Sequence, residues 1–234
     1  MNGHPRLLEA ALSIVAVIGG YFLLGYGLKF GLERVTIGGY ALSWSVWASL
    51  LLSVAVIIYT RSRGRSLSSL GLSRPRSNLK AVLTGVIGAV LIYAGVTMAV
   101  SVLAAFDLIT PPAAERVLLV DGPDLYLSLT LSIAVMWVNA AFGEELLFRG
   151  FLMNNLMRAF GDTRLAGFAA SAVIAVAFGV MHIPSQGLYG LVVTGAVGFL
   201  MGLLFLFGKR NLMPVVIAHG VINSVSMIAL ALLM

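Results

Sequence analysis

Six polar side chains that can move protons or donate hydrogen bonds interrupt otherwise apolar stretches of this sequence. They occur in three places, namely AAFGEELLFRG with Glu144, Glu145 and Arg149, AFGVMHIP with His182, and PVVIAHGVIN with His219 and Asn223. An ionisable side chain inside a membrane helix costs about 2.5–3.5 kcal/mol on translocon scales, so such residues are functional candidates by default. These six residues are therefore our candidate catalytic residues.

The two adjacent glutamates are expected to have different partners. Glu145 and Arg149 are four residues apart with the acid first, which is the favourable order for an ion pair on one helix face. Glu144 lies about 140° around the helix from Arg149, at about 100° per residue. We therefore expect Arg149 to hold Glu145 ionised, while Glu144 points elsewhere and is available as a general acid or base. The alternative is that both glutamates only form contacts between helices, which is more plausible for Glu145 alone than for the pair.

The spacing of the polar residues predicts that they meet at one depth. Glu144 is 18 residues before Asp162, and His182 is 20 residues after it. On an antiparallel helical hairpin, both then stand roughly 27–30 Å from the turn. His219 is nine residues past Arg210, roughly 13 Å into the membrane by the same rise. If the hairpin projects about 10–15 Å into the cytoplasm, the three groups line one cavity in the inner half of the bilayer. A lone membrane histidine, in contrast, often makes only an interhelical hydrogen bond.

Two kinds of chemistry fit these residue types. A carboxylate and an imidazole can polarise water for attack on a carbonyl group, while a second imidazole and a carboxamide stabilise the oxyanion. Alternatively, Glu144, His182 and His219 can supply three ligands to Zn²⁺ and leave a fourth position for water. The sequence has no cysteine, which excludes thiolate catalysis. The G-x-S-x-G, H-E-x-x-H and nucleotide-binding motifs are also absent from it.

The composition indicates which elements must position these groups. The chain of 234 residues is 60% hydrophobic and 10% charged, with a mean hydropathy of +1.02. Soluble domains carry about a quarter charged residues, and a domain of this size cannot hide so much apolar surface, so lipid must cover the remainder. We expect an all-α bundle of seven membrane helices, at about 7–28, 38–60, 81–106, 125–148, 165–183, 188–208 and 212–234, with the fourth continuing to about Phe160.

The first apolar run is too long for a signal peptide and is expected to be a retained span. Residues 1–124 are predicted to form N-terminal membrane helices and loops, and residues 125–234 the part that carries the six candidate residues, within one integral membrane domain. We expect Gly198 and Gly202 to let their helix approach a neighbour closely. Pro184 and Gly187 are expected to break the chain after the fifth helix.

The distribution of basic residues predicts the orientation. The segment 61–80 holds six basic residues and no acid. The segment 107–124, on the opposite side, holds four acids and a single basic residue, Arg116. Further basic residues fall on the same side as 61–80, namely Arg158, Arg164, Lys209 and Arg210. The positive-inside rule then places the N-terminus in the cytoplasm and the C-terminus outside. We expect the protein to lie in the cell membrane, with its active site accessible from the cytoplasmic side. The formal net charge of +6 is interpreted as orienting charge, so no nucleic-acid partner is expected.

At the candidate residues the sequence resembles the CAAX protease and bacteriocin-processing family of intramembrane proteases, which includes the Ras-converting CAAX endopeptidase. The family motifs E-E-x-x-x-R, F-x-x-x-H and H-x-x-x-N are present in order, as Glu144-Glu145-Leu-Leu-Phe-Arg149, Phe178-Gly-Val-Met-His182 and His219-Gly-Val-Ile-Asn223. The resemblance implies that Glu144 and His182 activate a water molecule, and that His219 and Asn223 stabilise the oxyanion. The family has been described both as glutamate-dependent and as metal-dependent.

We therefore expect an intramembrane endopeptidase that hydrolyses a membrane-associated protein or peptide in the lipid bilayer, with CAAX-type C-terminal processing as one possibility. The preferred mechanism needs no cofactor, and Zn²⁺ is the alternative. A second interpretation is a non-catalytic scaffold or regulator of a partner membrane protein, such as a sensor kinase or a transporter. A third is a small-solute or ion transporter, for which intramembrane Glu and His are also typical, although the sequence has no evident internal repeat.

Overall fold

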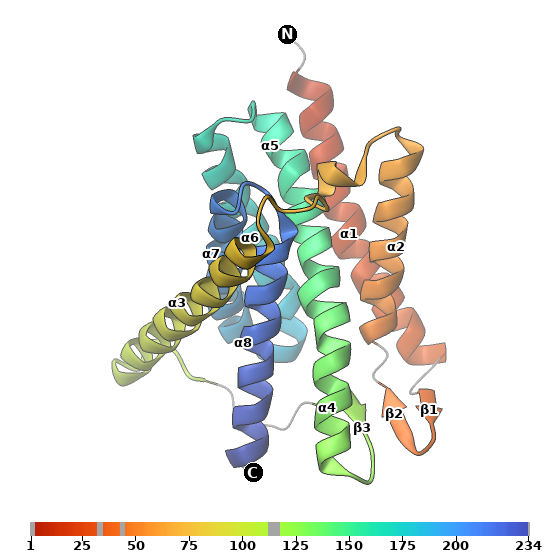
Figure 1. Cartoon of the computed structure of the whole chain (residues 1–234), viewed down its shortest axis with the longest axis vertical. Helices are drawn as coiled ribbons and strands as arrows, with labels where there is room; N and C mark the ends of the chain where they lie inside the picture. Colours follow the sequence, from red (N-terminus) through yellow and green to blue (C-terminus); the bar gives the residue numbers. More distant parts are fainter. Residues whose placement is uncertain (1–2, 32–34, 43–44, 112–117, 234) are drawn as a thin grey trace.

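Helices make up nearly all of the chain, and a small sheet lies at one end of the bundle (Figure 1). The computed structural model describes residues 3–31, 35–42, 45–111 and 118–233. The α-helices are α1 (Gly3–Gly31), α2 (Ser45–Ser62), α3 (Asn78–Ala105), α4 (Leu125–Met136), α5 (Asn154–Phe160), α6 (Arg164–Tyr189), α7 (Gly195–Phe207) and α8 (Leu212–Leu233). The remaining elements are η1 (Leu67–Leu70), η2 (Trp137–Glu144), η3 (Leu146–Met153), η4 (Gly190–Thr194), β1 (Val35–Ile37), β2 (Tyr40–Leu42) and β3 (Val120–Asp121).

The helical membrane bundle expected from the sequence is confirmed. Five stretches of the described chain are long and apolar enough to cross a membrane, namely Arg6–Gly27, Asn78–Ala105, Leu125–Phe160, Arg164–Phe207 and Leu212–Ala231. The fourth stretch contains two of the seven expected spans, 165–183 and 188–208. The expected span at 38–60 is represented by a shorter apolar helix, Ala48–Ser62.

The span expected from residue 38 begins later because a β-hairpin precedes it. Gly38 and Gly39 have φ values of +58° and +84°, which non-glycine residues rarely adopt, and they form the two-residue turn between β1 and β2. Strand β2 also pairs antiparallel with β3, with Ala41 opposite Asp121. This three-stranded sheet joins the α1–α2 connection to the segment that leads into α4.

Helices α6 and α7 form a tight antiparallel hairpin whose facing surfaces are rich in glycine. The chain turns at Gly187, where φ is 60° and ψ is −150°, whereas Pro184 stays inside α6. A Cβ atom at Gly202 would lie 2.0 Å from Ser171 Oγ, and one at Gly198 would lie 3.1 Å from the Phe178 side chain. The close approach expected for these two glycines is therefore present, and it brings the backbone of α7 against α6.

The helix that carries both glutamates is continuous from Leu125 to Phe160, but its middle is wound differently from an α-helix (Figure 1). Elements η2 and η3 are π-helical, with hydrogen bonds between residues i and i+5. Side chains five residues apart therefore follow one another along the helix, as Asn139 and Glu144 do. The sequence-based geometry of about 100° per residue applies to an α-helix and does not hold across this stretch.

The Arg-rich connections expected on one side of the membrane do share one end of the bundle. Leu212 N donates to Gly71 O at 3.1 Å, Asn211 Nδ2 donates to Ser73 O at 2.7 Å, and Arg210 pairs with Asp162. The described parts of 107–124 lie at the opposite end, where β3 joins the sheet (Figure 1). Residues 112–117, which include Glu115 and Arg116, lie outside the described residues. The assignment of the Arg-rich end to the cytoplasm stays a prediction.

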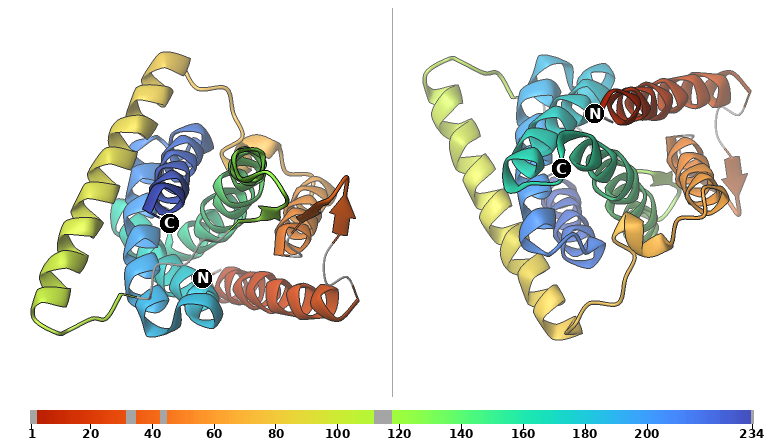
Figure 2. Two further views of the ribbon diagram at one scale, coloured as in Figure 1. Left: turned by 90° about the horizontal axis from the view of Figure 1, so that it is seen from below. Right: turned by 90° about the horizontal axis from the view of Figure 1, so that it is seen from above.

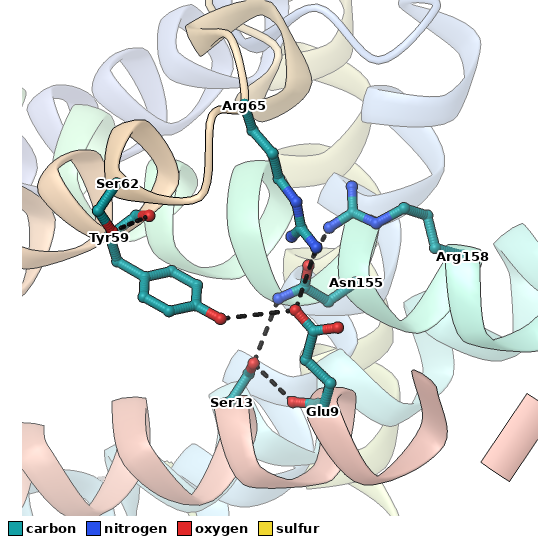
Figure 3. A network of polar contacts seen from close by, with 7 residues as sticks. All are labelled: Glu9, Ser13, Tyr59, Ser62, Arg65, Asn155 and Arg158. Carbon is teal, nitrogen blue, oxygen red and sulfur yellow. Dashed lines mark hydrogen bonds and ion pairs between the residues drawn. The ribbon is translucent and has the colours of Figure 1, made fainter. Parts of the chain in front are cut away.

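A polar cluster at the Arg-rich end joins α1 to α2, its following loop and α5 (Figure 3). Glu9 Oε1 accepts hydrogen bonds from Arg65 Nη2 at 3.2 Å and from the Tyr59 hydroxyl at 3.5 Å. Asn155 Nδ2 donates to Ser13 Oγ at 3.3 Å, and the Ser13 hydroxyl donates to the Glu9 carbonyl at 2.7 Å. Helix α3 lies at the opposite margin, tilted across α7 and α8 (Figure 2).

Candidate active site

The ion pair that the sequence spacing predicts is fully buried. Glu145 and Arg149 are both 0% exposed, and Arg149 Nη1 donates to Glu145 Oε1 at 2.9 Å. Arg149 Nη2 donates to the Gly198 carbonyl at 2.8 Å, and the guanidinium carbon lies 4.9 Å from the centre of the Phe178 ring. One arginine therefore connects η3 to α7 and to α6, and its loss would affect three helices at once.

The same carboxylate also binds His219, a contact that the sequence analysis did not find. His219 Nδ1 lies 2.8 Å from Glu145 Oε1. A carboxylate accepts, so Nδ1 carries the proton and Nε2 is the nitrogen available to other groups. Glu145 thus orients His219 as well as pairing with Arg149. The partners are 74 residues apart, so no helix-spacing rule could indicate the contact.

His182 is oriented by the backbone one turn before it. Its Nδ1 lies 2.8 Å from the Phe178 carbonyl oxygen, which can only accept, so Nδ1 donates and Nε2 keeps a free lone pair. The imidazole packs on the Phe178 ring with centroids 4.8 Å apart, and the same ring lies 6.3 Å from His219. The aromatic residue of the F-x-x-x-H motif therefore fixes both imidazoles.

Four of the six candidate residues line one cavity of about 740 Å³. They are Glu144, His182, His219 and Asn223, which come from η2, α6 and α8. Glu144, His182 and Asn223 are half-buried, whereas His219 is 8% exposed. Glu145 and Arg149 do not line the cavity but contact two residues that do, His219 and Phe178. The polar groups expected to meet at one level therefore do share a cavity.

The cavity extends toward the end of the bundle opposite the Arg-rich loops. Its lining there includes Leu119, which directly precedes β3, Gln186 at the α6 turn and Leu230 near the end of α8. The sequence analysis predicts access from the Arg-rich end instead. Gly187 ends the first arm of the hairpin only five residues after His182. His182 is therefore close to the α6–α7 turn, and access from the Arg-rich end stays a prediction.

Asn139 is a polar lining residue that the sequence analysis missed. It is 6% exposed, and its Oδ1 has no hydrogen-bond partner among the described residues. It precedes Glu144 by five residues, one turn of the π-helix, and lines the same cavity. The signal in the sequence is one amide within the apolar run before the glutamate pair. Tyr21 of α1 also lines the cavity, although no motif occurs in the N-terminal part.

In the described part of the chain, no three His, Cys, Asp or Glu side chains are grouped so that they could hold a metal ion. Glu144, His182 and His219, the ligands of the zinc alternative, all line the cavity. The zinc alternative stays a prediction.

Comparison with known proteins assigns the part of the chain that carries this cavity. Residues 126–225 match the family model described as type II CAAX prenyl endopeptidase Rce1-like. The match covers 100 of the 234 residues and identifies this region as an Rce1-like domain of the CAAX protease family. The matched region contains all six candidate residues of this Rce1-like protein. The Rce1-like family implies a protease that acts on a membrane-associated protein in a bilayer. No curated protein and no solved structure matches the chain.

Proposed function

We propose that this Rce1-like protein is an intramembrane endopeptidase that hydrolyses a peptide bond with a water molecule activated at Glu144 and His182. One observation carries the proposal, which is that Glu144, His182, His219 and Asn223 line a single cavity. Glu145 and Arg149, the other two candidates, form the buried pair behind it. Water-activating groups and hydrogen-bond donors are thus available to one carbonyl group.

The water-activating groups are both proton acceptors. His182 presents Nε2, because its Nδ1 is engaged by the Phe178 carbonyl. Glu144 presents a half-buried carboxylate in the same cavity. Either group can take a proton from water as its oxygen attacks the carbonyl carbon. The proton then passes to the leaving nitrogen as the C–N bond breaks, which leaves a new carboxylate and a new amine.

The oxyanion would be stabilised by His219 and Asn223. The Asn223 side chain has an amide donor, Nδ2, in either protonation state of its neighbours. His219 donates from Nε2 only when its ring is doubly protonated, because Nδ1–H already binds Glu145. Glu145 is on this proposal a positioning residue that orients the His219 ring.

Asn139 and the apolar lining would select the substrate. The unpaired Oδ1 of Asn139 is an acceptor for a backbone N–H of a bound peptide, one helical turn from Glu144. Other lining residues, such as Leu119, Ile222 and Met227, are apolar. This lining suits a hydrophobic peptide or a lipid-modified one. The family description supports a prenylated C-terminal CAAX sequence as the substrate class.

The proposal is tested with purified protein in lipid nanodiscs and a fluorogenic prenylated CAAX peptide. Glu144→Gln should lower turnover about 10²–10⁴-fold, the usual contribution of a general acid or base. Glu9→Gln is the matched control, because Glu9 belongs to the cluster at the Arg-rich end. Undiminished cleavage by Glu144→Gln would contradict the proposal. A metal-dependent mechanism would instead be supported if chelation abolished activity and Zn²⁺ restored it. The protein would then contain stoichiometric metal, and His182→Ala would lose that metal.

A further inference from the structure

A second cavity, of about 660 Å³, lies at the Arg-rich end and shares no lining residue with the candidate active site. It is formed between the segment that leads into α3, the α7–α8 turn and the start of α8. Residues 73–77 supply one wall and Lys80, Ala81 and Thr84 of α3 a second. The third wall consists of Phe207, Gly208, Lys209, Asn211 and Pro214. Neither the sequence motifs nor the proposed reaction uses this cavity.

The cavity carries four cationic side chains without counter-charge. They are Arg74, Arg76, Lys80 and Lys209, and no acid among the described residues lines the cavity with them. None of the four side chains forms an ion pair or a hydrogen bond within the described part of the chain. Like charges around one concave space repel one another, so an anion bound between them would be stabilised.

Two other arginines at this end are paired with acids. Arg65 pairs with Glu9 at 3.2 Å, as Figure 3 shows, and Arg210 pairs with Asp162. Asp162 is therefore already paired with Arg210, which does not line the cavity. Arg61 and Arg63 also have no ion pair among the described residues, but they are exposed and do not line this cavity.

The remaining lining is apolar or directs partial positive charge to the cavity. Ala81, Phe207 and Pro214 provide apolar surface, and Phe207 is 77% exposed beside the cationic groups. Helix α3 begins here, with Ser77 Oγ accepting from Lys80 N, and the positive end of a helix dipole favours an anion. A cationic rim next to apolar surface matches a phosphate group attached to acyl chains.

We propose that this cavity binds a phosphate-bearing anion, which in a membrane is the headgroup of an anionic phospholipid. Basic pockets between membrane helices on the cytoplasmic side bind such headgroups. The proposal is independent of the peptidase function, since it uses other residues. The phosphate chemistry is shared by a lipid and by free phosphate, and the experiment distinguishes these two sources.

The test measures lipid binding to the delipidated full-length protein by native mass spectrometry. Phosphatidylglycerol is titrated against zwitterionic phosphatidylcholine, for wild type and for two double variants with the same loss of charge. Arg76→Gln/Lys80→Gln removes two cavity cations, whereas Arg61→Gln/Arg63→Gln removes two exposed cations of the same connection that do not line the cavity. Lys209→Gln is a third, independent variant, because Lys209 lies on a different wall of the cavity from Arg76 and Lys80.

Arg76→Gln/Lys80→Gln should weaken phosphatidylglycerol binding roughly 30-fold and Lys209→Gln roughly fivefold. These factors take about 1 kcal/mol of binding free energy for each cation and about 1.4 kcal/mol for each tenfold change in affinity. The Arg61/Arg63 control should change binding less than about threefold, since those charges lie outside the cavity. Competition by millimolar inorganic phosphate would assign the site to the free anion, and its failure to compete would assign the site to the lipid. Equal losses in both double variants, or no preference over phosphatidylcholine, would overturn the proposal.

Discussion

Replacing Arg149 by methionine should destabilise the protein more than any single change at the cavity surface. The substitution removes the 2.9 Å hydrogen bond to Glu145 and the 2.8 Å hydrogen bond to the Gly198 carbonyl, together with the cation–π contact to Phe178. Glu145 is then left as a fully buried carboxylate with His219 as its remaining partner. Breaking one side of a buried ion pair costs about 3–5 kcal/mol. A loss of that size corresponds to a fall in Tm of roughly 6–20 °C for a chain of this length.

The assay is thermal unfolding in detergent, followed by tryptophan fluorescence, for a double-mutant cycle. Glu145→Gln keeps an oxygen that can accept from His219, so it removes the charge without removing that contact. The double variant Arg149→Met/Glu145→Gln should therefore be more stable than Arg149→Met alone, because no unpaired charge is buried. Glu144→Gln should leave Tm nearly unchanged. A larger loss of stability for Glu144→Gln than for Arg149→Met would refute the assignment of the two glutamates, and so would a double variant no more stable than the single one.

Three further predictions concern other parts of the molecule. Asn223→Ala should lower kcat about 10²–10³-fold with little change in KM, as loss of one oxyanion donor does; an effect on KM alone would remove Asn223 from that role. Gly202→Ala should destabilise the α6–α7 hairpin by about 1–3 kcal/mol in chemical denaturation, because its Cβ would meet Ser171 Oγ, and adding Ser171→Gly should restore stability. A cysteine at Ser68 should resist an impermeant thiol reagent in intact cells while one at Thr110 reacts, and the reverse pattern would invert the topology.

Hydropathy and charge were sufficient to predict the helical bundle and the gathering of the Arg-rich connections. Both depend on the average character of long segments, which the bilayer constrains strongly. The late start of the second span was missed because the apolar pattern continues through a hairpin. Its signal, the dipeptide Gly38–Gly39 between short β-branched and aromatic runs, was present in the sequence.

For the site, spacing within one helix predicted the Glu145–Arg149 pair, whereas contacts between helices could not be predicted from spacing. The bond from His219 to Glu145 depends on how α8 packs against η2 and η3, which no local pattern encodes. Access to the cavity from the Arg-rich end stays a prediction, because it depends on how the helices pack and not on the spacing within one of them.

The central claim is hydrolysis that depends on Glu144, and peptide lengths in the native membrane test it without a guess at the substrate. Membranes from cells that carry wild type or Glu144→Gln at equal protein levels are compared by quantitative proteomics of protein termini. At least one membrane-associated protein should have a shortened terminus in wild-type cells and keep its full length in Glu144→Gln cells. The same set of termini in both membranes, with the cellular role intact, would contradict the claim and favour a non-catalytic scaffold.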